Sequence, residues 1–444
     1  MNRTFRADRV HRTAVLRFAL LGALALVLVV PAAGFAGQAK KAAPQASTAS
    51  CQLQVFSWWT GGGEAAGLTK LIAIWNHNNP TCKFKNETVA GGAGSNAKAV
   101  LAQRLAAHKP PDSFQGHAGA ELRDYIKAGQ VEPIDFIYKK YHFDKVMPAS
   151  LINQIKYNGH LYSVPVNIHR ANMLWYNPKV LKAAGITKVP TTWTEFIAAL
   201  EKAKSNGVVP LALGQAWTQK HLLETVMIST LGPTRWAALW KKGGNWSSPG
   251  VTTALNRFKT LLTYTNSDAA ALTWQDAGKL VADGKAAFNI MGDWQDGYFS
   301  GTKAGGNLAL KPRTDYNWTA VPGTTGVYDW LSDSFTLPKG APHRNAAVKW
   351  LGFLGSRVAQ DTFNPVKGSI PARQDANPKL YGPYLKWALT QWRKNTLAGS
   401  LTHGVVAPNA WATDIGTALG LFLQTKDVNA FQTALANAAK KATS

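Results

Sequence analysis

Two adjacent tryptophans, Trp58 and Trp59, end the first predicted strand and are followed by a short glycine run and Glu64. The carboxyl end of a strand is where an open α/β sheet meets its ligand. A pyranose has apolar C–H faces that stack on aromatic rings, and a rim of hydroxyls that need donors and acceptors. Two rings beside a glycine turn and a carboxylate therefore favour a carbohydrate site. The alternative is that one or both rings belong to the core.

Other predicted strand ends carry groups of the same kind. Gln115 and His117 come at the exit of a short strand that begins near residue 110, and Trp294 follows a buried strand predicted over 285–291. Glutamine and neutral histidine each offer a hydroxyl both a donor and an acceptor. The alternative for Gln115 and His117 is an exposed loop without a ligand.

The elements that must position these residues begin with an alternation of short strands and amphipathic helices over residues 51–119. This pattern predicts a βαβαβ unit of an α/β sheet. Right-handed crossovers in that unit would bring Trp58, Gln115 and His117 to one rim of the sheet. The later pattern predicts helices over 193–206, 253–264 and 274–283, and a further strand over 331–337.

The chain has two cysteines, Cys51 and Cys82, and each lies just before a predicted strand. If those strands are parallel neighbours, the two cysteines lie side by side at their amino ends. We therefore predict a Cys51–Cys82 disulfide, which requires an oxidising compartment.

The amino terminus has the pattern of a secretory signal peptide over residues 1–36, with a basic stretch, an apolar run over 18–30 and small residues before a cleavage site. Residues 37–50 are typical of a flexible leader. Cys51 lies some distance beyond the apolar run, which argues against a lipid anchor there. We expect an exported, periplasmic protein.

The bulk composition narrows the class further. A mature chain of about 400 residues exceeds one hydrophobic core and predicts two lobes. The net charge of +25 is spread over scattered lysines in an exported chain, which favours a surface facing anionic envelope material over a nucleic-acid partner. The histidines show no metal-ligand spacing, so we expect neither a metal nor a cofactor.

The order of motifs along the chain resembles the extracellular solute-binding proteins of bacterial sugar ABC importers, and most closely their glucose-type monosaccharide-binding branch. The segments that carry the resemblance are FSWW at 56–59, GGAG at 91–94, PDSFQGHAG at 111–119, VPVNIHR at 164–170, GKAAFNIMGDW at 284–294, LSDSF at 331–335, NPVKGSI at 364–370 and HGVVAP at 403–408.

That resemblance implies a two-lobe α/β fold of the periplasmic binding protein-like type II class, with three hinge crossings and a ligand cleft between the lobes. It implies an amino-terminal lobe of residues 51–165 plus 333–368. The carboxyl-terminal lobe would comprise 166–332 plus 369–444.

The resemblance also implies a set of sugar-binding residues: Trp58, Trp59, Glu64, Gln115, His117, Trp274, Trp294, Asp333, Lys367 and His403. Alternatives remain for some of them. Glu64 can equally be a first-turn charge interacting with the helix dipole. Asp333 and Lys367 can instead form an ion pair in the hinge. Trp217 and Gln219 are weaker candidates, and His169 and Arg170 are expected to be structural.

The implied function is binding of a monosaccharide, with glucose favoured, by a monomer that delivers it to a membrane permease with ATPase subunits. The lobes would close on the sugar about the hinge. A sensor that signals to a receptor is a rival that the sequence does not separate. A glycoside hydrolase is a weaker rival, because it needs paired carboxylates and Glu64 and Asp333 are the only obvious candidates. We therefore expect no enzyme activity.

Overall fold

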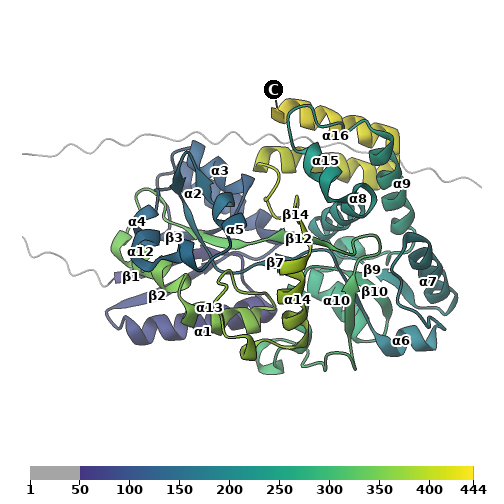
Figure 1. Ribbon diagram of the computed structural model, residues 1–444, viewed down its shortest axis with the longest axis horizontal. Coiled ribbons are helices and arrows are strands. Elements are labelled where there is room, and N and C mark those ends of the chain that lie inside the picture. Colours follow the sequence, from purple (N-terminus) through teal and green to yellow (C-terminus); the bar gives the residue numbers. More distant parts are fainter. Residues whose placement is uncertain (1–50, 444) are drawn as a thin grey trace, which may run out of the picture. The chain divides into compact units, whose positions relative to one another are not determined.

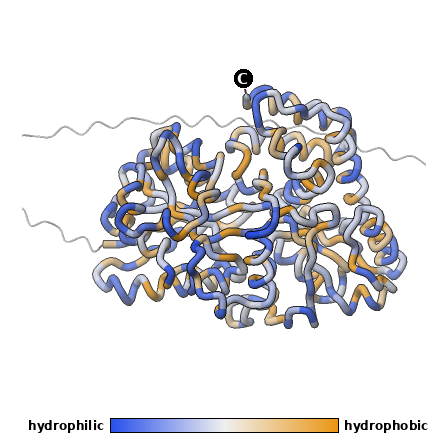
Figure 2. The backbone as a smooth tube through the Cα atoms, in the orientation of Figure 1, coloured by the Kyte–Doolittle hydropathy of each residue, from blue (hydrophilic) through white to orange (hydrophobic). Residues whose placement is uncertain are grey.

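The computed structural model describes residues 51–443, so the predicted signal peptide and leader lie outside the described residues. Among the described residues, no helix combines the length and apolar composition needed to cross a bilayer. Their buried apolar side chains form two large clusters. Figure 2 shows hydrophobic stretches along the strands and hydrophilic stretches on the outer helical turns.

A five-stranded sheet has the order β2-β1-β3-β13-β6. β1 pairs in parallel with β2 and β3, whereas β13 pairs antiparallel with β3 and β6. Figure 1 shows α1 and α13 on one side of these strands and α2 and α3 on the other. The predicted βαβαβ start is therefore confirmed. The bounds are β1 (Cys51–Ser57), α1 (Gly62–Asn78), β2 (Cys82–Thr88), α2 (Ser95–Ala106), β3 (Ser113–His117), α3 (Ala120–Lys127), β6 (Ser163–Pro165), β13 (Asp333–Thr336) and α13 (Arg357–Lys367).

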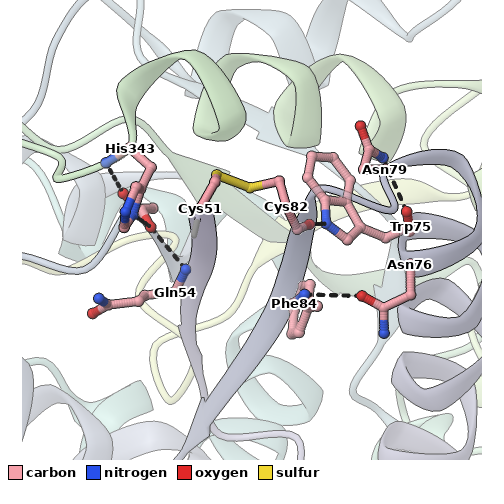
Figure 3. The surroundings of a disulfide bond; sticks show 9 residues. Cys51, Gln54, Trp75, Asn76, Asn79, Cys82, Phe84 and His343 are labelled. Carbon is pink, nitrogen blue, oxygen red and sulfur yellow. Dashed lines mark hydrogen bonds and ion pairs between the residues drawn. A yellow bond between two sulfur atoms is a disulfide. The ribbon is translucent and has the colours of Figure 1, made fainter. Parts of the chain in front are cut away.

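The predicted disulfide between Cys51 and Cys82 is present (Figure 3). The two residues are register partners in the β1–β2 pair, with Cα atoms 4.4 Å apart. The indole N–H of Trp75 in α1 donates to the carbonyl of Cys82 over 2.8 Å. The disulfide thus closes the first βαβ unit at the strand ends opposite Trp58.

A second group of strands forms a four-stranded sheet of order β11-β8-β10-β9 and a three-stranded sheet of order β14-β12-β7. Helices predicted over 193–206, 253–264 and 274–283 are confirmed as α7, α9 and α10. The bounds are β7 (His169–Arg170), β8 (Met173–Tyr176), α7 (Trp193–Ser205), β9 (Val209–Ala212), α8 (Ala216–Leu239), α9 (Pro249–Leu262), α10 (Trp274–Ala282), β10 (Ala286–Ile290), α11 (Trp294–Ser300), β11 (Asn317–Ala320), β12 (Val327–Leu331) and β14 (Thr396–Gly399).

The single strand predicted over 331–337 is wrong in one respect, because the structure divides this region between two sheets. β12 ends at Leu331 and pairs with β7, whereas β13 begins at Asp333 and pairs with β3. The chain therefore passes from one sheet to the other at Ser332. A second passage lies between β6 and β7, where Ile168 forms a bridge to Ile370.

The remaining elements complete the outer layers. They are α4 (Asp135–Tyr141), α5 (Ala149–Gln154), β4 (Lys156–Tyr157), β5 (His160–Leu161), α6 (Pro178–Ala183), α12 (Arg344–Leu354), α14 (Pro383–Lys394), α15 (Asn409–Thr425) and α16 (Val428–Thr443), with short 3-10 turns between them.

Candidate functional site

A cavity of about 820 Å³ opens where the carboxyl ends of β1 and β3 face the beginnings of α10 and α11. It is lined by most of the residues that the sequence suggested, although they come from segments far apart in the chain. These are Trp58, Glu64, His117, Trp274, Trp294, Asp333, Lys367 and His403.

Trp59 does not line the cavity, which corrects the expectation that both tryptophans of the pair face the ligand. Its ring packs against Phe363 and Phe335, at centroid distances of 4.6 and 5.3 Å, and it is only 1% exposed. Adjacent residues of an extended chain point to opposite sides, so one ring of the pair faces the cavity and the other faces the core.

Trp58 is held in place by a close approach of the backbone at Gly94. A Cβ atom at Gly94 would lie 2.8 Å from the indole ring of Trp58, and Gly94 has a φ of +87°. Both facts require glycine at this position. The GGAG segment at 91–94 therefore forms part of the wall behind Trp58.

Gln115 also lies outside the cavity lining, but it holds two residues that do line it. Its Oε1 accepts from the backbone N–H of Trp58 over 3.2 Å, and its Nε2 donates to Oδ1 of Asp333 over 2.9 Å. Gln115 is therefore a positioning residue rather than a direct contact to the cavity.

Asp333 presents an ionised carboxylate to the cavity. Its Oδ2 accepts from Nδ2 of Asn167 over 2.7 Å and lies 3.4 Å from Nε2 of His169. Burial alone would raise the pKa of Asp333, but the hydrogen bond from His169 and the positive charge of Lys367 lower it well below its usual range. A carboxylate held in this way accepts from ligand hydroxyls without changing its protonation.

His169 lines the cavity as well as supporting it, although we expected only a structural role. Its Nδ1 forms a short hydrogen bond to Oδ1 of Asp293, and its Nε2 faces Asp333. Burial acts to lower the pKa of His169, but the charge of Asp293 and the hydrogen bonds to Asp293 and Asp333 together raise it. Arg170 is structural as expected, since it is buried and donates to Asn172 and to the carbonyl of Val327.

Glu64 and Lys367 meet at the edge of the cavity, where Nζ of Lys367 lies 2.6 Å from Oε1 of Glu64. The contact depends on a close approach of α1 to the end of α13. A Cβ atom at Gly63 would lie 2.4 Å from the carbonyl oxygen of Val366. The glycine run before Glu64 thus brings the carboxylate to Lys367.

His117 and His403 each use Nδ1 in a hydrogen bond to another residue of the protein, which leaves Nε2 for the cavity. Nδ1 of His117 bonds Oε2 of Glu121 over 2.8 Å, and Nζ of Lys98 reaches the same oxygen over 2.7 Å. Burial would raise the pKa of Glu121, but Lys98 and His117 lower it to about 2. This ionised carboxylate fixes Nδ1 of His117 as the donor.

For His403, the hydrogen bonds of Ser400 determine which ring nitrogen carries the proton. Oγ of Ser400 donates to Oε1 of Glu224 over 2.7 Å, so its 2.9 Å contact with Nδ1 of His403 requires the imidazole to donate. Burial, together with the charges of His117 and His221, lowers the pKa of His403 well below its usual value. His403 is therefore neutral, and its Nε2 is an acceptor.

Aromatic rings form a continuous wall around the cavity. The ring centroids of Trp58 and His117 are 5.0 Å apart, those of His117 and His403 are 5.5 Å apart, and those of His403 and Trp294 are 5.1 Å apart. Trp217, a weaker candidate from the sequence, also lines the cavity and lies 6.1 Å from Trp294. The wall connects the end of β1 with the beginning of α11.

Several lining residues were missed by sequence reasoning, because nothing in their local pattern marks them. They are Thr60, Asn96, Gln275, Asp276 and Tyr298. Gln219, in contrast, does not line the cavity, and its Nε2 donates to the carbonyl of Gly214.

Within residues 51–443, one buried group offers ligand atoms close enough together for a metal ion, namely His221, Glu224 and His403. Internal hydrogen bonds already use much of its capacity. Nε2 of His221 bonds the carbonyl of Ala171, and both carboxylate oxygens of Glu224 accept from the segment at 400–402. The group therefore ties α8 to the loop that carries His403.

Comparisons with known proteins agree with this architecture. Residues 58–361 match the family model of bacterial extracellular solute-binding proteins. An uncharacterized ABC transporter extracellular-binding protein of Pyrococcus horikoshii is 38% identical over 435 residues, 97% of each chain. A probable sugar-binding periplasmic protein of Brucella suis is 33% identical over 408 residues, 89% of this chain and 91% of the relative.

Among solved structures, the bacterial solute receptor AcbH, described as having an exclusive preference for β-D-galactopyranose, superposes with a TM-score of 0.75. It is 20% identical and covers 88% of this chain and 98% of its own, which shows a shared fold. The expectation that this chain is not an enzyme agrees with these matches to binding proteins. The chain belongs to the family of bacterial extracellular solute-binding proteins.

Proposed function

We propose that this protein binds a monosaccharide, with glucose the first candidate, and delivers it to an ABC-type importer made of a membrane permease and ATPase subunits. The observation that carries the proposal is that Trp58, Trp274 and Trp294 all line one cavity. The names of the Brucella suis and AcbH relatives support a sugar as the ligand class. Glucose rests on the motif resemblance.

The chemistry of the cavity suits a pyranose. Indole faces supply apolar plates for the C–H faces of the ring. Asp333 and Nε2 of His403 accept from hydroxyls, and Lys367 donates. Charged partners make such hydrogen bonds stronger and more selective for the arrangement of hydroxyls.

The same contacts argue against glycoside hydrolysis. A hydrolase needs one carboxylic acid that holds a proton for the leaving group. Asp333 is ionised, because His169 and Lys367 keep its pKa low, and Glu64 is paired with the Lys367 ammonium group. The third carboxylate of the lining, Asp276, accepts from the backbone N–H and the hydroxyl of Thr273. None of the three is placed as a proton donor.

The mechanism we propose is closure of the two expected lobes about the segments at Ser332 and at 166–168. Trp58 follows a strand of the five-stranded sheet, whereas Trp274 and Trp294 begin helices of the other expected lobe. A sugar that contacts both groups favours the closed form by its differential affinity. We further propose that the chain is exported by the signal peptide over 1–36, acts as a periplasmic monomer and carries no lipid at Cys51.

A thermal-shift screen tests the proposal, with glucose, galactose, mannose, xylose, maltose and cellobiose as probes. A ligand at one hundred times its Kd stabilises the folded state by about 2.7 kcal/mol, which raises the Tm by a few degrees. We expect at least one monosaccharide to raise the Tm of the wild type but not of Trp294→Ala. A panel in which no sugar moves the Tm would contradict the proposed function.

A further inference from the structure

A second cavity of about 680 Å³ adjoins the first, and Ala93 and Trp217 line both. Its other walls come from α2, α3, α8, the loop at 401–404 and α15. His403 faces the first cavity, whereas its neighbours Thr402 and Gly404 face the second. Ala93 and Trp217 therefore mark the border at which a ligand in the first cavity comes nearest to the second.

The charged side chains of the second cavity are unevenly matched. Lys98 and Glu121 form an ion pair of 2.7 Å, and Glu121 also bonds His117. Lys220 of α8 lines the same cavity, but its side-chain ammonium group has no hydrogen-bond or ion-pair partner among the described residues. Glu224, one turn further along α8, is occupied by Ser400 and Thr402.

The second cavity is open along α15. The wall formed by α15 carries Gly416 and Gly420, and a Cβ atom at either would meet no other atom within 4 Å. The remaining wall is mainly apolar, with Tyr125, Leu419 and Leu423. A cavity with apolar sides and one unmatched cation fits a ligand with an apolar face and one negative charge.

The lack of a bonded anion also affects the pKa of Lys220. Burial, with a contribution from the positive charge of Lys98, outweighs the negative charges of Glu224 and Glu121 and lowers the pKa of the Lys220 ammonium group to about 8. An anion against Nζ would compensate both effects, because it stabilises the charged form of the lysine. A single carboxylate balances this one charge, whereas a phosphate ester would bring nearly two negative charges.

We propose that the second cavity binds a hexuronic acid unit, joined to the sugar in the first cavity, whose carboxylate pairs with Lys220. This inference rests on the proposed function, since the first sugar unit must occupy the first cavity. It makes acidic disaccharides, in which a uronic acid is linked to a neutral hexose, the preferred ligands. Trp217 would lie between the two units and contact both.

Isothermal titration calorimetry tests this with glucose, cellobiose and maltose, and with the two disaccharides in which a glucuronic acid replaces the non-reducing glucose of each. We expect one acidic disaccharide to bind at least tenfold more tightly than its neutral counterpart. Lys220→Met should remove that difference and leave glucose affinity within twofold, whereas Lys220→Arg should keep most of it. Lys349→Met is the matched control, because Lys349 is exposed and lines neither cavity.

The outcomes separate the two proposals. Failure of every sugar to bind contradicts the proposed function. Binding of neutral sugars with no preference for either acidic disaccharide overturns only the hexuronic acid site. Equal losses for neutral and acidic ligands in Lys220→Met would also overturn it. Glucuronic acid that binds as tightly alone as when linked, without competing with glucose, would contradict the joined ligand.

Discussion

Nζ of Lys367, at the end of α13, lies 2.6 Å from Oε1 of Glu64, in the first turn of α1. The sequence resemblance predicts that both side chains bind the sugar, whereas in the structure they form an ion pair with each other at the edge of the cavity. Lys367 also lies 5.7 Å from the centroid of the Trp294 ring. One ion pair thus connects the amino end of α1 with the aromatic wall.

The first prediction concerns this ion pair. Glu64→Gln should destabilise the protein more than Lys367→Met, because Lys367, at 2% exposure, is the more deeply buried partner and would be left without its carboxylate. We expect Glu64→Gln to lower the free energy of unfolding by about 3 kcal/mol. Lys367→Met should lower it by about 2 kcal/mol. Urea denaturation of both single variants and of the double variant measures the coupling. Additive losses would show that the two charges do not interact.

The second prediction separates the adjacent tryptophans. Trp59→Ala should lower the free energy of unfolding by about 3 to 5 kcal/mol, because it leaves a hole between Phe335 and Phe363. Trp58→Ala should cost clearly less stability, since its ring borders a cavity that already exists. Chemical denaturation of the two variants compares them directly. Equal losses would mean that Trp58 is as much a core residue as Trp59.

The tryptophan pair, Trp58 and Trp59, shows which features of the structure can be predicted from the sequence and which cannot. The alternating strands and helices of residues 51–119 are a local pattern, so they predicted the strand neighbours and the disulfide correctly. Which tryptophan faces the cavity depends on the direction of the chain as it leaves β1. The hydrophobic periodicity of the sequence does not predict that direction. The same holds for Ser332, where one apparent strand divides between two sheets because its halves pair with different partners.

The charged contacts of the site were less accessible to sequence reasoning. Glu64 and Lys367 are 303 residues apart in the chain, and no local rule pairs them. His169 acquires its position from Asp293 and Asp333, which lie on distant segments. The motif resemblance assigned Glu64 and Lys367 to a sugar site and left His169 as a structural residue, but only the folded chain shows which side chains contact each other.

The third prediction concerns the disulfide. Replacing Cys51 and Cys82 together by serine should lower the free energy of unfolding by about 2 to 4 kcal/mol, since the disulfide restricts the unfolded chain. Sugar affinity should stay within twofold of the wild type, because the cysteines lie at the opposite ends of β1 and β2 from the cavity. A large loss of affinity in a folded double variant would contradict this separation of roles.

The fourth prediction concerns pH and His403. Its pKa in the folded protein is well below the unfolded value, so the unfolded state takes up a proton below about pH 6.5 that the folded state does not. The contribution of neutral His403 to stability is therefore lost as the pH falls below that value. Relative to His403→Gln, the wild type should lose up to about 1.4 kcal/mol per pH unit between pH 6 and 5.

Urea denaturation of the wild type and His403→Gln at pH 7, 6 and 5 measures this difference. His221, whose pKa is lowered in the same direction, is present in both proteins, so its contribution largely cancels. Parallel pH profiles would show that His403 titrates alike in the folded and unfolded states.

The most direct measurement of the central claim is calorimetric titration of the wild type, Trp58→Ala and Trp294→Ala with the monosaccharide that gives the largest thermal shift. If rings from both sides of the cavity hold one sugar, each variant should fold and bind at least tenfold more weakly. Wild-type affinity in both folded variants would contradict the account.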